Sequence, residues 1–395
     1  MKYNFDKLTN RFNTNSLKWN VNENELPMWV ADMDFEVAPC ITDAIEKRLE
    51  NRIFGYSDVP EKWAESYVNW WEKRHHYTME KDWLIFTTGV IPALSSIVRK
   101  LTTPNENVLI LTPVYNIFFN SILNNGRRVL ECPLVYDGNR YEIDFNDLEQ
   151  KLADPQTSMM ILCNPHNPVG KIWDQETLED IARLCHKHNV IVVSDEIHCD
   201  IVKPGKEYIP FASVSEKARN ISVTLIAPTK CFNMAGLQSA AVSVANPYLR
   251  HKVWRGLNTD EVAEGNCFSV EVAIAAFENG EDWIDEMNEY VDENKQIASD
   301  FINEKMSQVS VVSSKATYLV WIDCNKIKGT SKDICEFIRK ETGLFLSEGS
   351  QYGRSGTHFI RMNVACPRER LIDGLHRFQL GMEMYVQSLK EKNNV

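Results

Sequence analysis

Apolar and polar residues alternate in blocks along this chain. Short apolar runs without internal polar alternation predict strands that are buried on both faces. Segments with helical spacing lie between them. In 174–189, for example, Leu178, Ile181 and Cys185 fall on one face, and Asp174 precedes them as a typical N-cap. The pattern predicts an α/β fold with a mainly parallel sheet. The predicted strands lie within residues 83–90, 107–115, 158–170, 190–198 and 221–230.

The C-terminal third predicts a second, smaller unit. Residues 281–306 have the spacing of one long amphipathic helix, and 316–324 and 358–366 are typical of strands. We expect the long helix to join two domains. The expected division is a large domain over residues 48–285 and a small domain formed by residues 1–47 and 286–395.

Each predicted strand of the large domain is followed by a residue that could bind a ligand or take part in a reaction. In open parallel sheets, ligands bind beyond the carboxyl ends of the strands, so these residues are expected to share one site. A lysine held at such an edge is partly desolvated, which lowers its pKa and favours the nucleophilic free amine. The residues are Gly89, Tyr115, Asn167, Asp195 and Lys230.

This set matches the needs of pyridoxal 5′-phosphate. The cofactor uses a Schiff-base lysine and a carboxylate that keeps its pyridine nitrogen protonated, here Lys230 and Asp195. Its phosphate favours the N–H groups at a helix start, which Gly89, Val90 and Ile91 offer. Further candidates are Tyr115 as a ring that stacks on the cofactor, and Asn167 and His198 as donors to its phenolic oxygen.

Composition and charge exclude several classes of partner. The 395 residues carry a formal net charge of −12, which argues against nucleic acid and anionic membranes. The sequence shows no membrane span and no apolar leader, so we expect a cytoplasmic protein. The ten cysteines form no C-x-x-C pair and are expected to be reduced core residues. The histidine spacing predicts no metal site, since His186 and His188 point apart on a helix and His75-His76 is a polar doublet.

Seven motifs in order carry a resemblance across nearly the whole chain. They are PMWVADMDF (27–35), TTGVIPAL (87–94), PVY (113–115), NPHNPVGKIW (164–173), SDEIHCDIV (194–202), APTKCFNMAGLQ (227–238) and RMNVACPRERL (361–371). The chain resembles the class I and II aminotransferase superfamily, and within it the MalY/PatB type of cystathionine β-lyases and cysteine-S-conjugate β-lyases. The resemblance implies fold type I, with a seven-stranded, mainly parallel sheet in the large domain and a smaller α+β domain.

The resemblance also implies roles for matching residues. Lys230 is the expected Schiff-base lysine and proton shuttle, and Asp195 the partner of the ring nitrogen. Arg361 is expected to hold the substrate α-carboxylate, with Val30 and Asn167 as further substrate contacts. The remaining expectations are Tyr115 as the stacking ring, Thr229 as a phosphate contact, and Tyr56 as a residue that reaches the cofactor phosphate of the partner in a homodimer.

Structural alternatives stand beside these roles. Asp195 has an alternative as a helix N-cap, and Arg361 as a surface salt-bridge residue. Tyr115, Tyr56, Trp29 and Tyr318 have an alternative as core aromatics, and Asn167 as a turn residue, with a cis bond before Pro168.

Three departures from the wider superfamily bear on the reaction. His198 replaces a frequent tyrosine, Ala227 a phosphate-binding serine and Gln238 an arginine, which disfavours a plain aminotransferase. We therefore expect a β-lyase that splits L-cystathionine or a related cysteine S-conjugate to thiol, pyruvate and ammonia. The leaving thiol stays open. The alternatives are an aminotransferase and a regulator that acts by binding another protein. A nicotinamide-dependent oxidoreductase lacks its G-x-G-x-x-G signature.

Overall fold

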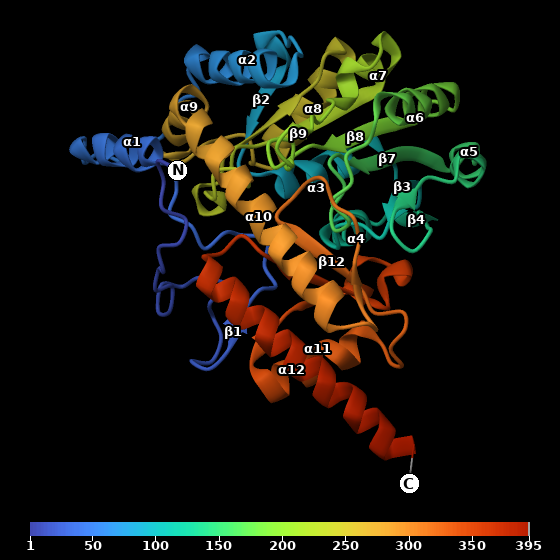
Figure 1. Ribbon diagram of the computed structural model, residues 1–395. Coiled ribbons are helices and arrows are strands. Elements are labelled where there is room, and N and C mark those ends of the chain that lie inside the picture. The colour runs from blue at the N-terminus through green and yellow to red at the C-terminus, as the bar shows by residue number, and fades with distance from the viewer. Residues whose placement is uncertain (394–395) are drawn as a thin grey trace.

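A seven-stranded sheet lies at the centre of the computed structural model, which describes residues 1–393 (Figure 1). Its strand order is β2-β10-β9-β8-β7-β3-β4, with β10 antiparallel to both neighbours and every other pair parallel. The predicted α/β fold is confirmed, and each of the five predicted regions contains a strand. The strands are β2 (Leu84–Thr87), β3 (Asn107–Thr112), β4 (Arg128–Pro133), β7 (Thr157–Cys163), β8 (Ile191–Asp195), β9 (Ser222–Ile226) and β10 (Ala240–Ser243).

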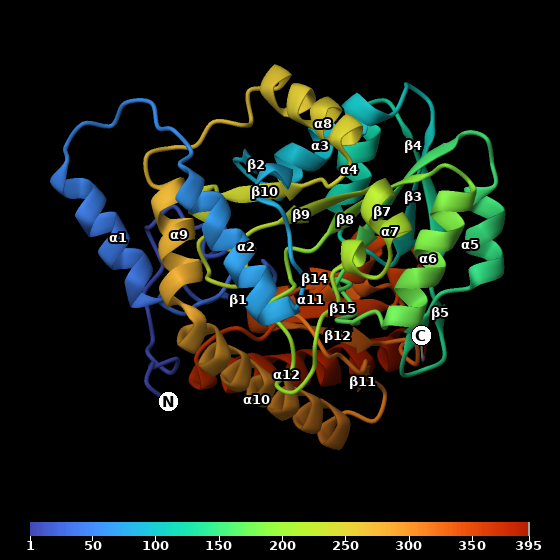
Figure 2. The same ribbon diagram turned by 90° about the horizontal axis from the view of Figure 1, so that it is seen from above.

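Helices cover both faces of this sheet (Figure 2). Successive residues of one strand point to opposite faces. Val108 and Ile110 of β3 therefore pack in a cluster with α3, α4 and α8, whereas Leu109 and Leu111 pack in a cluster with α5, α6 and α7. Burial on both faces explains why these strands are apolar throughout. The helices are α3 (Val90–Leu101), α4 (Ile117–Leu123), α5 (Phe145–Leu152), α6 (Gln175–Lys187), α7 (Glu216–Ile221) and α8 (Pro247–Thr259).

Helix α6 shows how local sequence sets the boundaries. Asp174 is its N-cap and accepts a hydrogen bond from the backbone N–H of Thr177 at 2.8 Å, as predicted. Leu178, Ile181 and Cys185 lie buried on its inner face. The apolar positions of the sequence therefore predicted both this helix and its buried face correctly.

A second, four-stranded antiparallel sheet has the order β11-β12-β15-β14. Its core includes Trp19, Ile322, Ile360, Leu371 and Phe378, so the N-terminal and C-terminal parts of the chain contribute together. The predicted strands near 316–324 and 358–366 are confirmed. The elements are β11 (Ser310–Val311), β12 (Leu319–Asp323), α11 (Ser331–Thr342), β13 (Leu344–Phe345), β14 (Ser347–Glu348), β15 (Phe359–Asn363) and α12 (Arg368–Asn393).

Helix α10 (Glu281–Lys305) joins the two sheets, as predicted (Figure 1). Trp283 and Met287 in its first half pack in the cluster beside the large sheet, and Ala298 and Ile302 in its second half pack in the core of the small sheet. The division at residues 48 and 285 remains a prediction, because residues 1–47 contribute to the cores of both bodies.

The N-terminal residues cross from one body to the other. β1 (Leu26–Pro27) pairs with β13 near the small sheet, whereas Phe35 and Ile41 pack with α2 (Glu61–His75) and α9 (Ser269–Asn279). Ile41 lies on α1 (Pro39–Glu50), which packs on α9. A short hairpin pairs β5 (Val135–Tyr136) with β6 (Tyr141–Glu142). The segment between β1 and α1 is thus held against both sheets.

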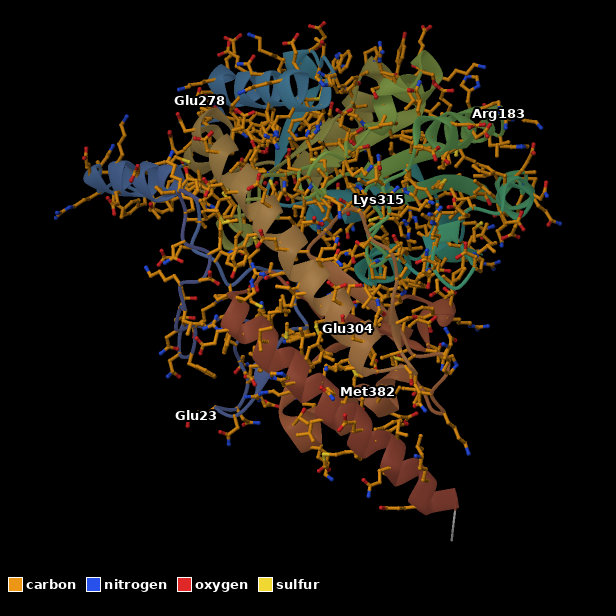
Figure 3. The ribbon with its side chains drawn as sticks, in the orientation of Figure 1. Glu23, Arg183, Glu278, Glu304, Lys315 and Met382 are labelled. Atoms are coloured by element: carbon orange, nitrogen blue, oxygen red, sulfur yellow. The ribbon has the colours of Figure 1, made fainter. Side chains whose placement is uncertain are left out.

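The surface is charged and the cysteines are reduced. Arg183, Glu278 and Glu304 exemplify the exposed charged side chains of both bodies (Figure 3). All ten cysteines are free, and most are buried, which confirms their predicted character. Among residues 1–393, no helix is both long and apolar enough to cross a membrane.

Candidate active site

Lys230 lies in a turn four residues beyond β9. Its Nζ donates a hydrogen bond to the carbonyl oxygen of Ala31 at 2.5 Å, although some of the side chain stays exposed. Burial lowers the pKa of Lys230 to about 8; the nearby Asp32 and Asp195 oppose the shift, and Arg361 adds to it. Lys230 therefore supplies a free amine closer to neutral pH than an ordinary lysine does.

Asp195 is the last residue of β8 and is buried. Its carboxylate accepts a hydrogen bond from the backbone N–H of Ile197 at 3.1 Å. Burial and the neighbouring Glu196 raise the pKa of Asp195 to about 7, while the Ile197 N–H and Lys230 pull it down. The residues after Asp195 form turns, not a helix, so the alternative role as a helix N-cap is wrong.

Arg361 comes from the other sheet and meets Asn167. It lies on β15, is only 5% exposed, and donates from Nη1 to Asn167 Oδ1 at 3.3 Å and from Nη2 to the Trp29 carbonyl at 2.8 Å. The guanidinium carbon sits 4.9 Å from the centre of the Tyr352 ring. Its buried Nε has no partner within the described part of the chain. Arg361 is thus no surface salt-bridge residue.

Tyr115 and His198 border the same group of charges. Burial raises the pKa of Tyr115 to about 12, with Arg361 lowering it and Asp195 raising it. Burial lowers the pKa of His198 to about 3, and the charges of Lys230 and Arg361 add to this shift. Both side chains are therefore neutral at pH 7, and the buried Nδ1 of His198 lacks a partner among residues 1–393.

The start of α3 supplies backbone donors. Gly89 precedes the helix, and Val90 and Ile91 are its first residues, so their N–H groups have no acceptor within the helix. A Cβ on Gly89 would stand 3.2 Å from Pro92 Cδ, tighter than ordinary contact. Thr229 is buried directly before Lys230. These residues suit an anionic group at the helix N-terminus.

Two predicted site residues stand apart from the buried charges. Val30 takes part through its backbone: its carbonyl oxygen accepts a hydrogen bond from Asn363 Nδ2 at 2.6 Å. Tyr56 is 104% exposed and has no hydrogen bond or ring contact with any residue of the described range. The structure of one chain therefore does not bring Tyr56 to Lys230, and it is no core aromatic.

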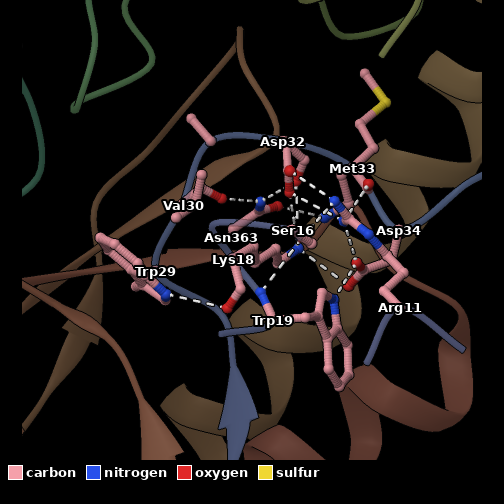
Figure 4. A network of polar contacts seen from close by, with 12 residues as sticks. Arg11, Ser16, Lys18, Trp19, Trp29, Val30, Asp32, Met33, Asp34 and Asn363 are labelled. Atoms are coloured by element: carbon pink, nitrogen blue, oxygen red, sulfur yellow. Dashed lines mark hydrogen bonds and ion pairs between the residues drawn. The ribbon is translucent and has the colours of Figure 1, made fainter. Parts of the chain in front are cut away.

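The segment around Asp32 and Asp34 is tied down by a network of charges (Figure 4). Arg11 pairs with Asp32 at 2.9 Å and with Asp34 at 2.8 Å, and the fully buried Lys18 pairs with Asp34 at 3.0 Å. Trp19 Nε1 donates to the same Asp34 carboxylate at 2.8 Å. These contacts hold the backbone next to Ala31, whose carbonyl accepts the hydrogen bond from Lys230.

Sequence reasoning missed two contributors and left a third open. Ala31 provides the acceptor for Lys230, and Asn363 anchors the residues on both sides of it. Tyr318, which has an alternative as a core aromatic, donates from its hydroxyl to the Ala31 carbonyl at 2.9 Å. Asn363 had a usable signal, because residues two apart on a strand share a face and Arg361 is its neighbour there.

The structure also gathers His75, Cys199 and Asp200, whose potential ligand atoms lie within 4.8 Å of one another. The two oxygens of the Asp200 carboxylate already share the single N–H of Trp70 Nε1, at 3.0 and 3.2 Å, and one of them lies 3.4 Å from Arg74 Nε. A cation in this position would meet the Arg74 guanidinium. The expectation of no metal site stays a prediction.

The arrangement fits pyridoxal 5′-phosphate. Asp195 has a single backbone donor and space in its acceptor capacity for a protonated ring nitrogen. The unpartnered Nδ1 of His198 and Nε of Arg361 are the kind of buried polar atoms that a ligand satisfies.

Comparisons with known proteins agree with this chemistry. The sequence model of the family "aminotransferase class I and II" matches residues 16–378. Cystathionine β-lyase PatB of Bacillus subtilis strain 168 is 37% identical over 96% of this chain and 100% of that protein. Cystalysin of Treponema denticola, whose structure contains a pyridoxal 5′-phosphate cofactor, superposes with a TM-score of 0.94 at 31% identity, over 97% of this chain and 99% of cystalysin. The pyridoxal-phosphate-bound C–S lyase of Staphylococcus hominis has a TM-score of 0.89 at 32% identity, over 96% and 99%.

Proposed function

Because this chain belongs to the aminotransferase class I and II family, we propose that it is a pyridoxal-phosphate-dependent carbon–sulfur β-lyase. Its substrates are L-cystathionine or related cysteine S-conjugates, and its products a thiol, pyruvate and ammonia. The observation that carries the proposal is the convergence of Lys230, Asp195 and Arg361 where the two sheets meet. Similarity over the full length to PatB and to C–S lyases supports the type of reaction.

Lys230 and Asp195 hold the cofactor. When bound, pyridoxal phosphate supplies an electron sink for negative charge at the α-carbon of an amino acid. Lys230 Nζ is the amine that would bind it covalently. The Asp195 carboxylate would hold a proton on the ring nitrogen, and this ion pair would in turn lower the raised pKa of the buried carboxyl. Neutral Tyr115 provides a face for the ring, and Asn167 and His198 provide donors.

Arg361 orients the substrate. Its buried Nε and one Nη together present the planar fork that a carboxylate binds with two hydrogen bonds. Asn167 and Trp29 already hold the other side of the guanidinium, so the fork does not need to be ordered when the substrate arrives. Val30 follows Trp29 in the chain, and its proposed contact with the substrate comes from this segment.

Lys230 moves the substrate proton. With an amino-acid substrate bound, the free amine of Lys230 would take the proton from the substrate α-carbon. A positioned base typically contributes about 10²- to 10⁴-fold in rate. A pKa lowered toward neutrality keeps part of the lysine in the free amine form at pH 7. Cleavage of the bond between the β-carbon and sulfur would then expel the thiolate, and water would hydrolyse the released enamine to pyruvate and ammonia.

A homodimer completes the phosphate site. Tyr56 is fully exposed on a segment without helix or strand, near the exposed Ile53 and Phe54. We propose that these side chains meet a second copy and that Tyr56 reaches the phosphate held by Gly89, Val90, Ile91 and Thr229 of that copy. The dimer thus explains an apolar surface that one chain leaves open.

The test is to supply the pyridoxal-phosphate-loaded protein with L-cystathionine and no keto acid, and to measure pyruvate and free thiol together. Equal release over many turnovers is expected, and Lys230→Ala abolishes it. If no pyruvate forms and a keto acid is needed to regenerate the loaded enzyme, the protein is an aminotransferase and the lyase proposal fails.

A further inference from the structure

The consecutive backbone carbonyls of residues 29–32 accept hydrogen bonds from side chains of the site. The Trp29 oxygen accepts from Arg361 Nη2 at 2.8 Å and from Ser347 Oγ at 2.9 Å. The Ala31 oxygen accepts from Lys230 Nζ at 2.5 Å and from the Tyr318 hydroxyl at 2.9 Å. This segment, rather than a side chain, thus lies between the carboxylate-binding arginine and the lysine.

Asn363 grips the segment on both sides of Ala31. Its Nδ2 donates to the Val30 carbonyl at 2.6 Å and to the Asp32 carbonyl at 2.6 Å (Figure 4). Its Oδ1 accepts from the Ala365 N–H at 2.8 Å, which fixes the orientation of the amide. The side chain is 1% exposed, so water does not compete for these bonds. The peptide that carries the Ala31 oxygen is therefore immobilised from both neighbours.

A free lysine amine needs such a hold. The four-carbon side chain of lysine has many rotamers, and most of them place Nζ too far from the α-carbon of the substrate to take its proton. An N–H donated to a peptide carbonyl orients the nitrogen while its lone pair remains free, and the carbonyl is too weak a base to take the proton itself. The geometry around Ala31 meets this need.

We propose that Asn363 is a positioning residue for Lys230. It fixes the Ala31 carbonyl as the hydrogen-bond acceptor that holds the free ε-amine of Lys230 while this amine exchanges the substrate proton. The inference rests on the proposed role of Lys230 as the base. Tyr318 shares the same carbonyl oxygen and limits how strongly that oxygen attracts the lysine.

The chain offers a matched control in Asn294. This buried asparagine of α10 makes the same grip, with Nδ2 donating to the Val364 and Cys366 carbonyls at 2.9 Å each, but neither peptide contacts Lys230. Asn363→Ala and Asn294→Ala therefore remove the same kind of buried Nδ2 pair, and Asn363→Ala also removes the bond that Oδ1 accepts from the Ala365 N–H. Both variants should lose thermal stability, and Asn363→Ala should lose somewhat more.

The first measurement uses cofactor-free protein. Competitive acylation with acetic anhydride across pH, read by mass spectrometry of the Lys230 peptide, reports the titration of this one amine. Asn363→Ala should move its midpoint to lower pH, because the ammonium form loses a fixed acceptor. Tyr318→Phe, which keeps the packing, should move it to higher pH, because Lys230 no longer shares the acceptor. Asn294→Ala should leave it unchanged.

The second measurement uses loaded enzyme and the exchange of the α-proton of L-alanine with deuterium. This step requires the lysine whether the enzyme is a lyase or an aminotransferase. Asn363→Ala should slow exchange about 10- to 100-fold with little change in the alanine concentration for half-maximal rate, and Asn294→Ala should not slow it. An unshifted midpoint in Asn363→Ala, or equal shifts in both asparagine variants, would overturn the proposal. A failed pyruvate assay with these shifts intact would sink only the lyase function.

Discussion

Arg361 on β15 of the small sheet donates a hydrogen bond from Nη1 to the side-chain oxygen of Asn167, 3.3 Å away and beyond β7 of the large sheet. The contact joins the two bodies at the point where substrate and cofactor are proposed to meet. Arg361 is assigned to the substrate carboxylate and Asn167 to the cofactor ring. Any movement of one body relative to the other would therefore change the distance between carboxylate and ring.

The paired donors of the Arg361 guanidinium predict that a positive charge alone is insufficient to bind the substrate carboxylate. Arg361→Lys keeps the charge but loses the paired donors, which are worth about 1.5–3 kcal/mol toward a charged partner. We expect kcat/KM for L-cystathionine to fall about 10- to 100-fold, chiefly through KM. The exposed Arg354→Lys serves as control. Unchanged KM in Arg361→Lys would show that another group binds the carboxylate.

Asp195 should control the electron demand of the cofactor. Asp195→Asn keeps the shape but no longer favours a protonated ring nitrogen, so kcat should fall about 10²- to 10³-fold, the effect typical of losing one preorganised electrostatic group. The measurement is the rate of pyruvate release at saturating substrate, with the bound cofactor quantified. Near-normal kcat in a fully loaded Asp195→Asn enzyme would contradict the assignment.

The pKa of Lys230 predicts how cofactor attachment depends on pH. Burial lowers the pKa of this lysine from 10.5 to about 8. Only the deprotonated amine attacks the cofactor aldehyde, so the rate of attachment to cofactor-free protein should rise with pH and reach half its maximum near pH 8. Stopped-flow absorbance measures this rate. A midpoint above pH 10 would mean that the lysine is not desolvated.

The shared phosphate site predicts complementation between inactive subunits. A mixed dimer of Lys230→Ala and Tyr56→Ala subunits contains one site with both residues intact. Random mixing yields such dimers as half of the total, so activity should return to about a quarter of the wild-type value. Either variant alone is the control. No recovery after verified subunit exchange would place Lys230 and the Tyr56 that serves it on the same chain.

The buried pair of Lys18 and Asp34 should dominate the stability of the N-terminal segment. Burial alone would raise the pKa of Asp34, but Lys18 and the hydrogen bonds from Trp19 and Arg11 hold it below 3.8. Lys18→Met leaves the carboxylate with less compensation and should lower the free energy of unfolding by about 3 kcal/mol. Lys7→Met, which breaks the exposed pair with Glu36, should cost less than about 1 kcal/mol.

The same pair predicts a pH dependence of defined sign. The folded-state pKa of Asp34 is lower than the unfolded value, so its stabilisation is present above about pH 4 and is lost as the pH falls through the folded pKa. The difference in unfolding free energy between wild type and Lys18→Met should therefore shrink on acidification. Urea unfolding at several pH values measures it; a difference that grows at low pH would contradict the ion-pair explanation.

The sequence predicted the large sheet well because its strands are buried on both faces. Such strands, like β3 and β7, are apolar throughout and are followed by polar loops, so both their existence and the polar residues at their ends are visible locally. β4 and β10 were not predicted. β4 contains charged residues, is exposed at both ends and is mostly half-buried between them, and β10 consists of four small residues, so neither stands out as an apolar run.

By itself, the sequence predicted which residues of this protein carry chemistry: strand ends and motif resemblance pointed to Lys230, Asp195, Asn167 and Arg361, and the structure brings these residues together. Only the tertiary structure decided what holds them. The acceptor of Lys230 is the peptide carbonyl of Ala31, and a carbonyl is present in every residue, so no side-chain pattern distinguishes it. Its role arises because folding brings together segments that lie about two hundred residues apart along the chain.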